Sequence, residues 1–111
     1  MRRAARRGKY NARKTTVANI VFASAKEARR YQELKLLEKA GEITGLELQP
    51  RFMLTVKGVK IGEYRGDFRF RERIDGQWFW TVEDTKGFRT PLYRWQAKHV
   101  LAEHGVEIHE A

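Results

Sequence analysis

The 111-residue sequence contains no cysteine and only two prolines. Without cysteine the chain has no disulfide framework, no thiolate metal site and no cysteine nucleophile. No apolar run approaches the ~18 to 20 residues that a membrane-spanning helix requires. A basic start followed by VANIVFASA resembles a signal peptide, but this stretch is short and Asn19 interrupts it. We therefore predict no signal peptide and a cytoplasmic location.

Acidic residues are absent from the first 14 positions, although the chain as a whole has a net charge of +9. Seven basic residues lie in this segment: Arg2, Arg3, Arg6, Arg7, Lys9, Arg13 and Lys14. Residues 15–111 are nearly balanced in charge and fit the usual size of one domain. We predict a flexible basic arm over residues 1–14 that binds a polyanion, or alternatively a disordered tail that improves solubility.

The stretch SAKEARRYQELKLLEKAG has the features of an amphipathic helix. Ser24 fits an N-cap, Glu27 follows three residues later, and Gly41 ends the pattern. The apolar side chains follow the three-and-four spacing of a buried helix face, at Ala28, Tyr31, Leu34 and Leu37. The sequence predicts a helix packed on a sheet.

Three strands are predicted after this helix, at residues 46–56, 59–71 and 78–85. The pairs Lys57-Gly58 and Asp75-Gly76 are typical of tight hairpin turns between them. A second helix begins at Pro91 and ends at Gly105, and the short strand VEIH follows. The order αβββαβ predicts an α+β fold with a mixed central sheet flanked by helices.

The stretch VEDTKG places two acids and a lysine at the end of the most hydrophobic strand. Asp84 and Lys86 are two residues apart and share a strand face, whereas Glu83 points to the other face. A carboxylate there can hold a divalent cation while an ammonium group orients water and offsets phosphate charge. An ordinary ion pair is the alternative.

Asp67 lies on the preceding strand of the hairpin, which can pair alongside the strand that carries Asp84. Gly66 beside it permits a bulge or a close backbone approach. The alternative role for Asp67 is a salt bridge with Arg65 or Arg69.

Glu27 is a third acid that the helical periodicity directs at the sheet. It either completes a capping box with Ser24 or joins a metal site. Two carboxylates 4 Å apart repel by ~4 kcal/mol at an effective dielectric constant of ~20, and a bound divalent cation would relieve this repulsion. Oxygen ligands without histidine or thiol favour Mg²⁺, with Mn²⁺ as a substitute.

The set of Glu27, Asp67 and Asp84-Thr85-Lys86 in an αβββαβ order resembles the PD-(D/E)XK nuclease superfamily, whose fold is restriction-endonuclease-like. The phrases KYNARKTT, SAKEARRYQELKLLEKAGEI, LELQPRF and VEDTKG resemble, more narrowly, a family of small phage-encoded proteins of that superfamily similar to Holliday-junction resolvases. The resemblance implies that Glu27, Asp67, Asp84 and Thr85 bind metal and that Lys86 is the catalytic lysine. Gly66 stands where the superfamily's name has proline.

The sequence therefore predicts a Mg²⁺-dependent, structure-selective endodeoxyribonuclease, in particular a homodimeric phage resolvase of Holliday junctions or other branched DNA. The DNA contacts are predicted in the basic arm and at Arg65, Arg89 and Lys98. Two alternatives stay open. One is a basic nucleic-acid-binding protein without enzymatic activity, and the other is a recombination or transposon-end nuclease subunit that needs a partner.

Overall fold

The computed structural model describes residues 14–85 and 90–111. Most of the predicted basic arm lies outside these residues, and only Lys14 of its basic side chains falls within them. Lys86 and Arg89, which the sequence assigns to catalysis and to DNA binding, also lie outside the described residues. The rest of the predicted site belongs to the described part of the chain.

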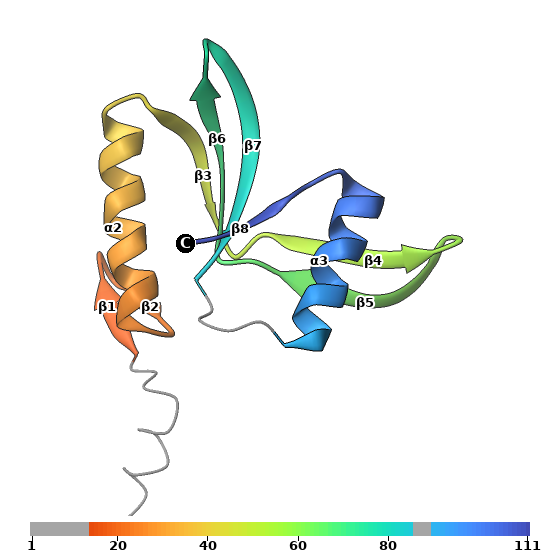
Figure 1. Cartoon of the computed structure of the whole chain (residues 1–111). Helices are drawn as coiled ribbons and strands as arrows, with labels where there is room; N and C mark the ends of the chain where they lie inside the picture. The colour runs from red at the N-terminus through yellow and green to blue at the C-terminus, as the bar shows by residue number, and fades with distance from the viewer. Residues whose placement is uncertain (1–13, 86–89) are drawn as a thin grey trace, which may run out of the picture.

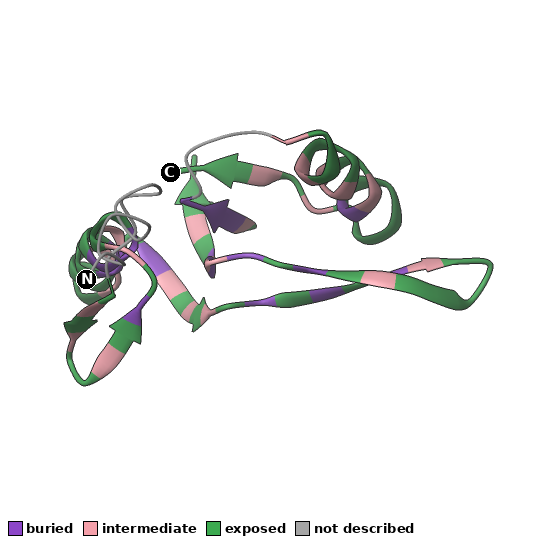
Figure 2. Cartoon of the chain, turned by 90° about the horizontal axis from the view of Figure 1, so that it is seen from below, coloured by how far each residue is buried: buried purple, intermediate pink, exposed green. Residues whose placement is uncertain are grey.

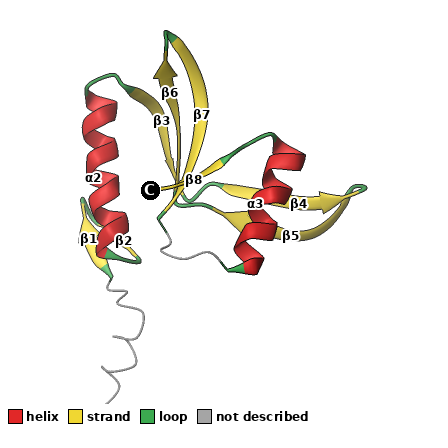
Figure 3. Cartoon of the chain, in the orientation of Figure 1, coloured by secondary structure: helices red, strands yellow, loops and turns green. Residues whose placement is uncertain are grey.

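Figure 3 shows helices and strands joined by loops and turns, and the described residues form the two α-helices α2 and α3. In chain order the elements are β1 (Thr15–Val17), β2 (Ile20–Phe22), α2 (Ala25–Lys39), β3 (Ile43–Leu48), β4 (Arg51–Val56), β5 (Val59–Arg65), β6 (Phe68–Ile74), β7 (Gln77–Asp84), α3 (Pro91–His104) and β8 (Ile108–Glu110). Both helices and both predicted hairpin turns are confirmed.

Helix α2 begins and ends where its sequence predicts. The Ser24 hydroxyl oxygen accepts the amide N–H of Glu27 at 3.1 Å. At the other end Gly41 has φ of 82°, and its N–H donates to the Glu38 carbonyl at 3.1 Å. The N–H of Glu42 donates to the Leu37 carbonyl at 2.9 Å, which completes a Schellman motif. Local hydrogen bonds therefore fix the length of this helix.

The first two predicted strands are each broken in the middle, which corrects the prediction of continuous strands at 46–56 and 59–71. The breaks lie at Gln49-Pro50, between β3 and β4, and at Gly66-Asp67, between β5 and β6. Gln49 has φ of 50°, and Pro50 has no N–H to donate to a ladder, so extended pairing stops there. In Figure 1 the β4–β5 hairpin turns away from β3 and β6 at this point.

The central sheet has the strand order β3-β6-β7-β8. Its first two pairings are antiparallel, and β8 is parallel to β7, so the sheet is mixed. Figure 1 shows α2 on one side of this sheet and α3 on the other, across the β4–β5 hairpin. The α+β class is thus confirmed. The last strand begins two residues later than predicted, at Ile108.

Two clusters of buried apolar side chains form the core, and β6 and β7 separate them. The cluster next to α2 consists of Phe22, Ala28, Tyr31, Leu34, Ile43, Phe68 and Phe70. The cluster next to α3 consists of Phe52, Leu54, Tyr64, Val82 and Val100. Figure 2 shows that the outer end of the β4–β5 hairpin is largely exposed, while buried positions lie nearer its base.

Of the described residues, no helical segment combines the length and the apolar character that a membrane-spanning helix needs.

Candidate functional site

Asp67 lies in the break just before β6 and contacts the end of β7. Its Oδ2 atom accepts two hydrogen bonds from Thr85, at 2.7 Å from the backbone N–H and at 2.8 Å from the hydroxyl. The backbone N–H of Asp67 donates to the Glu83 carbonyl at 3.0 Å. These contacts hold the Asp67 carboxylate beside the Asp84-Thr85 pair, across 18 residues of sequence.

Gly66 makes this close approach possible. A Cβ atom at position 66 would lie 3.0 Å from Cγ1 of Val82 and 3.5 Å from the Glu83 carbonyl oxygen. A contact of 3.0 Å is tighter than most real Cβ contacts, so a larger residue would require Val82 or the Asp67 turn to shift by a few tenths of an ångström. The predicted close backbone approach at Gly66 is therefore confirmed.

Asp84 is only 1% exposed, and Tyr64 is its partner across the core. The Tyr64 hydroxyl donates to Oδ2 of Asp84 at 2.6 Å. Burial, above all, and this hydrogen bond raise the pKa of Tyr64 above its ordinary value, so the phenol stays protonated and keeps donating. The charge of Asp67 acts on the pKa of Tyr64 in the same direction. Tyr64 was not predicted as part of the site, because only the tertiary structure brings β5 to β7 here.

Glu83 faces the opposite side of β7, as its position in the strand predicts. The register pairs it with Phe68, which belongs to the apolar cluster beside α2. There Arg30 of α2 binds both carboxylate oxygens of Glu83, from Nε at 2.8 Å and from Nη2 at 2.6 Å. The hydrogen bond to Glu83 is the largest cause that raises the pKa of Arg30 above its ordinary value. Sequence reasoning missed this pair.

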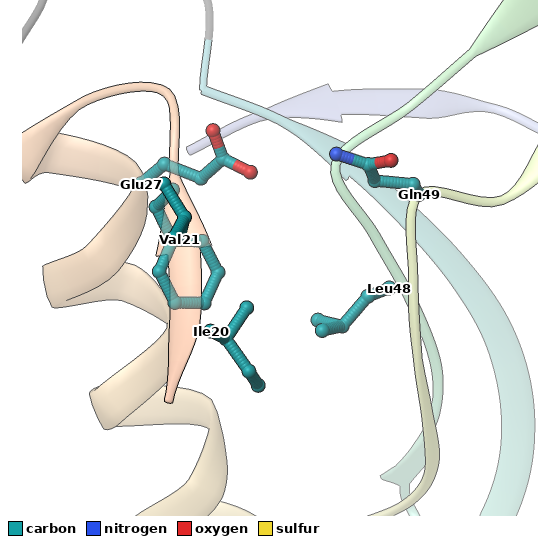
Figure 4. A pocket seen from close by; sticks show the side chains of 6 residues that line it. Ile20, Val21, Glu27, Leu48 and Gln49 are labelled. Carbon is teal, nitrogen blue, oxygen red and sulfur yellow. The ribbon is translucent and has the colours of Figure 1, made fainter. Parts of the chain in front are cut away.

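Glu27 lines a pocket of about 260 Å³ between α2, β2 and the end of β3. The other lining residues are Ile20, Val21, Phe22, Leu48 and Gln49. In Figure 4 the carboxylate of Glu27 and the amide of Gln49 point toward one another across this pocket. Glu27 is only 5% exposed, and its carboxylate is directed into the pocket. Its backbone N–H meanwhile donates to the Ser24 hydroxyl oxygen. The structure thus shows that Ser24 caps the Glu27 amide, whereas a role of the Glu27 carboxylate in a metal site stays a prediction.

Gln49 connects this pocket to Asp67. Its backbone N–H donates to the Asp67 carbonyl at 2.9 Å, and its φ of 50° is uncommon for a residue other than glycine. Such conformations cluster at functional positions because the surrounding structure must hold them. Gln49 lies within the phrase LELQPRF, and the sequence pattern predicts no role for it. Its neighbour Pro50 was the one signal that the chain turns here.

The oxygen ligands at this site suit a hard divalent cation. The carboxylates of Glu27, Asp67 and Asp84 are of the type that Mg²⁺ and Mn²⁺ prefer. The amide of Gln49 turns its nitrogen toward Glu27 (Figure 4). In this arrangement, however, Oδ2 of Asp67 and Oδ2 of Asp84 already accept hydrogen bonds. Among residues 14–85 and 90–111, no three histidine, aspartate or glutamate side chains gather closely enough for one ion. Joint coordination by the three acids stays a prediction.

The three predicted DNA-binding residues within the described part are all exposed. Lys14 precedes β1, Arg65 ends β5 just before the Gly66 turn, and Lys98 lies on α3. Arg65 pairs with Arg51 in the β4–β5 register, which places two cations side by side near the Asp67 turn. Their contact with DNA stays a prediction.

The chain belongs to a family of proteins of unknown function, DUF1064, whose family model matches residues 7–108. Searches of curated proteins and of solved structures each found no match. The family match covers nearly the whole described chain, including Glu27, Asp67, Asp84 and Thr85. The family model assigns no activity.

Proposed function

We propose that this protein is a metal-dependent, structure-selective endodeoxyribonuclease that resolves Holliday junctions or other branched DNA, in the manner of the phage-encoded nucleases that its sequence resembles. One observation carries the proposal. Asp67 is held beside Asp84-Thr85, at the end of β7, by three hydrogen bonds. Two come from Thr85 to the Asp67 carboxylate, and one runs from the Asp67 N–H to the Glu83 carbonyl. Asp84 is buried and Asp67 is half-buried, and two carboxylates held near one another away from water repel and favour a positive partner.

The side chains divide the work in a way that suits phosphodiester hydrolysis. Asp67 and Asp84 would hold Mg²⁺ or Mn²⁺, with Glu27 completing the set after a rearrangement of its side chain. Thr85 fixes the Asp67 carboxylate, and Tyr64 fixes Asp84 while remaining protonated. A divalent cation there would supply an activated water and offset the charge that develops on the phosphate. Lys86, two residues after Asp84, would orient that water and stabilise the same charge.

A homodimer suits this activity, because cutting two strands of a junction requires two sites. The basic arm together with Arg65, Arg89 and Lys98 would contact the phosphate backbone and confer a preference for DNA shape over base sequence. Such contacts depend on counterion release and therefore weaken with salt.

The direct test is an assay of the purified protein on a panel of four-way, three-way, nicked and linear DNAs of matched length. With Mg²⁺ or Mn²⁺ we expect cleavage of the branched substrates and little or none of the linear duplex. A chelator is expected to stop cleavage and leave binding in gel shifts. A protein that leaves every substrate intact with either cation, and also after the cation concentration is varied, refutes the proposal for the isolated chain.

A nucleic-acid-binding protein without catalytic activity is the second candidate. It is favoured by the hydrogen bonds that already occupy Oδ2 of Asp67 and Oδ2 of Asp84. On this view the acids only organise internal contacts. Titration with Mn²⁺ followed by paramagnetic broadening of NMR signals from residues near Asp67 and Asp84 separates the two, because only a nuclease site requires the ion. A recombination or transposon-end nuclease subunit would instead bind the ion and cut only with its partner.

Deletion of residues 1–14 tests the predicted arm. We expect weaker binding and a flatter dependence of the binding constant on salt, with a slope of log K against log salt reduced by up to ~6 for seven lost phosphate contacts. The measurement is fluorescence anisotropy with a labelled junction at several salt concentrations. An unchanged slope would show that the arm does not contact DNA.

A further inference from the structure

One face of the β6–β7 hairpin carries alternating arginine and tryptophan side chains. The register pairs Arg71 with Trp80 and Arg73 with Trp78. The guanidinium carbon of Arg69 lies 4.4 Å from the centre of the Trp80 ring, that of Arg71 lies 5.6 Å from the same ring, and that of Arg73 lies 5.5 Å from Trp78. We refer to these five residues as the arginine–tryptophan stripe.

The stripe is largely accessible. Trp80 is 52% exposed and Trp78 is 42% exposed, which is unusual for such large apolar side chains. Arg69 forms an ion pair with Glu47 at 3.1 Å, whereas Arg71 and Arg73 form none within residues 14–85 and 90–111. Cation–π contacts hold these guanidinium groups against the rings, and their N–H groups can still donate to an anion.

The stripe lies on the same side of the β6–β7 hairpin as Asp67 and Asp84. Side chains alternate along a strand, so Asp67 shares a face with Arg69 and the two following arginines, and Asp84 shares a face with Trp80 and Trp78. Six residues separate Asp84 from Trp78, about 20 Å along β7. A strand of nucleic acid with one phosphate at Asp84 would therefore run along the stripe toward the hairpin turn.

We propose that the stripe binds an unpaired DNA strand next to the cleaved bond, with the arginines on successive phosphates and the exposed tryptophan surfaces stacked against bases. Alternating cations and aromatic rings are the features by which proteins hold single strands. No acidic residue of β6 or β7 occupies this face between the two aspartates and the turn. Glu47 of β3 pairs with Arg69 there, so Arg71 and Arg73 are the charges of the stripe that complement a polyanion. The choice of DNA rests on the proposed function, while the binding surface does not depend on catalysis.

The first test removes the two arginines without an ion pair, in the full-length chain and with a chelator present to prevent cleavage. Arg71→Gln with Arg73→Gln is compared with Arg29→Gln and Lys39→Gln, which removes two exposed charges from α2. The probe is a labelled 20-nucleotide oligothymidylate, measured by anisotropy at several salt concentrations. We expect the stripe variant to lose at least tenfold in affinity and ~1.4 in salt slope, as for two single-strand contacts, relative to the control.

The second test separates stacking from charge. Trp80→Leu is compared with Phe79→Leu, its neighbour on the opposite face of β7, which is 47% exposed. The tryptophan variant is expected to bind oligothymidylate roughly 5- to 100-fold more weakly, and the phenylalanine variant is expected to bind like the original chain. Thermal melting of both variants shows whether the hairpin is intact. If a folded Trp80→Leu variant binds normally, the stacking role is refuted.

Three results would overturn the assignment. Equal affinity of the stripe and α2 variants would show that the arginines do not contact the strand. Equal losses on single-stranded and duplex DNA would refute a preference for an unpaired strand. Dissociation of a dimer in sedimentation velocity, with unchanged oligonucleotide binding, would instead make this face a contact between two copies. A different pair of results separates the two proposals. If the original chain cuts no DNA but the stripe variants lose binding of the single strand, the nuclease proposal is refuted and the binding surface stands.

Discussion

Asp84→Asn is expected to lower Mg²⁺-dependent cleavage of junction DNA by roughly 10³-fold, because a metal ion contributes several kcal/mol of charge stabilisation that an amide cannot support. The substitution keeps the size of the side chain, and its amide oxygen can still accept the hydrogen bond from Tyr64. The fold and the DNA-contacting surfaces are therefore expected to persist. The measurement is the single-turnover cleavage rate of a labelled four-way junction, with affinity measured separately in a chelator.

The matched control for this experiment is Asp75→Asn. Asp75 is exposed in the β6–β7 turn and has φ of 51°, a conformation that asparagine adopts readily. Like Asp84→Asn, this substitution removes one negative charge from the β6–β7 hairpin, but at the turn, which is the end opposite Asp67 and Asp84. We expect it to cleave at the original rate. An Asp84→Asn protein that cuts junctions as fast as this control would remove Asp84 from the catalytic set and with it the proposed mechanism.

The second large effect is expected from Arg30→Met, which should lower the free energy of unfolding by about 2 to 3 kcal/mol. Arg30 makes a bidentate contact with Glu83, whose side chain is only 9% exposed. Loss of the arginine would leave a nearly buried carboxylate without its charge partner. Breaking a fully buried pair costs ~3 to 5 kcal/mol, and solvent around the 27% exposed arginine reduces that figure. Urea denaturation monitored by tryptophan fluorescence measures the difference.

Arg29→Met is the control for the loss of a surface arginine. Arg29 precedes Arg30 on α2 and is exposed, so its replacement is expected to change stability by less than ~0.5 kcal/mol. Double substitution of Arg30→Met with Glu83→Leu provides a further check, because removing both charges should recover part of the stability lost by Arg30→Met alone. If Arg30→Met and Arg29→Met are equally stable, the ion pair contributes nothing to the attachment of α2 to β7.

Local signals in the sequence were sufficient for the helices and the turns. Ser24 and Gly41 bound α2, and Pro91 and Gly105 bound α3, through hydrogen bonds that span only a few residues. The Asp75-Gly76 turn likewise sets the pairing of β6 with β7. These features depend on backbone groups close in sequence, which is why the pattern alone predicts them.

The continuous strands were a wrong prediction for an identifiable reason. Alternation of apolar side chains continues through Gln49 and Gly66, so the pattern of 46–56 and 59–71 looks unbroken. Pro50 signalled a break on one strand only. The bend forms because the two interruptions lie opposite one another, and they are joined by the hydrogen bond from the Gly66 N–H to the Pro50 carbonyl at 3.0 Å. The position of the bend was decided by pairing between the two strands, which a linear sequence pattern does not contain.

The sequence by itself determined the two helices and their ends, the two hairpin turns, and the face of β7 on which each acid lies. The tertiary structure alone decided that Thr85 holds Asp67, that Tyr64 donates to Asp84, that Arg30 neutralises Glu83, and that Gln49 faces Glu27 across a pocket. The reason is physical: periodicity and capping act over a few residues, whereas these contacts join side chains 18 or more residues apart, and only packing of the whole sheet against both helices sets such distances.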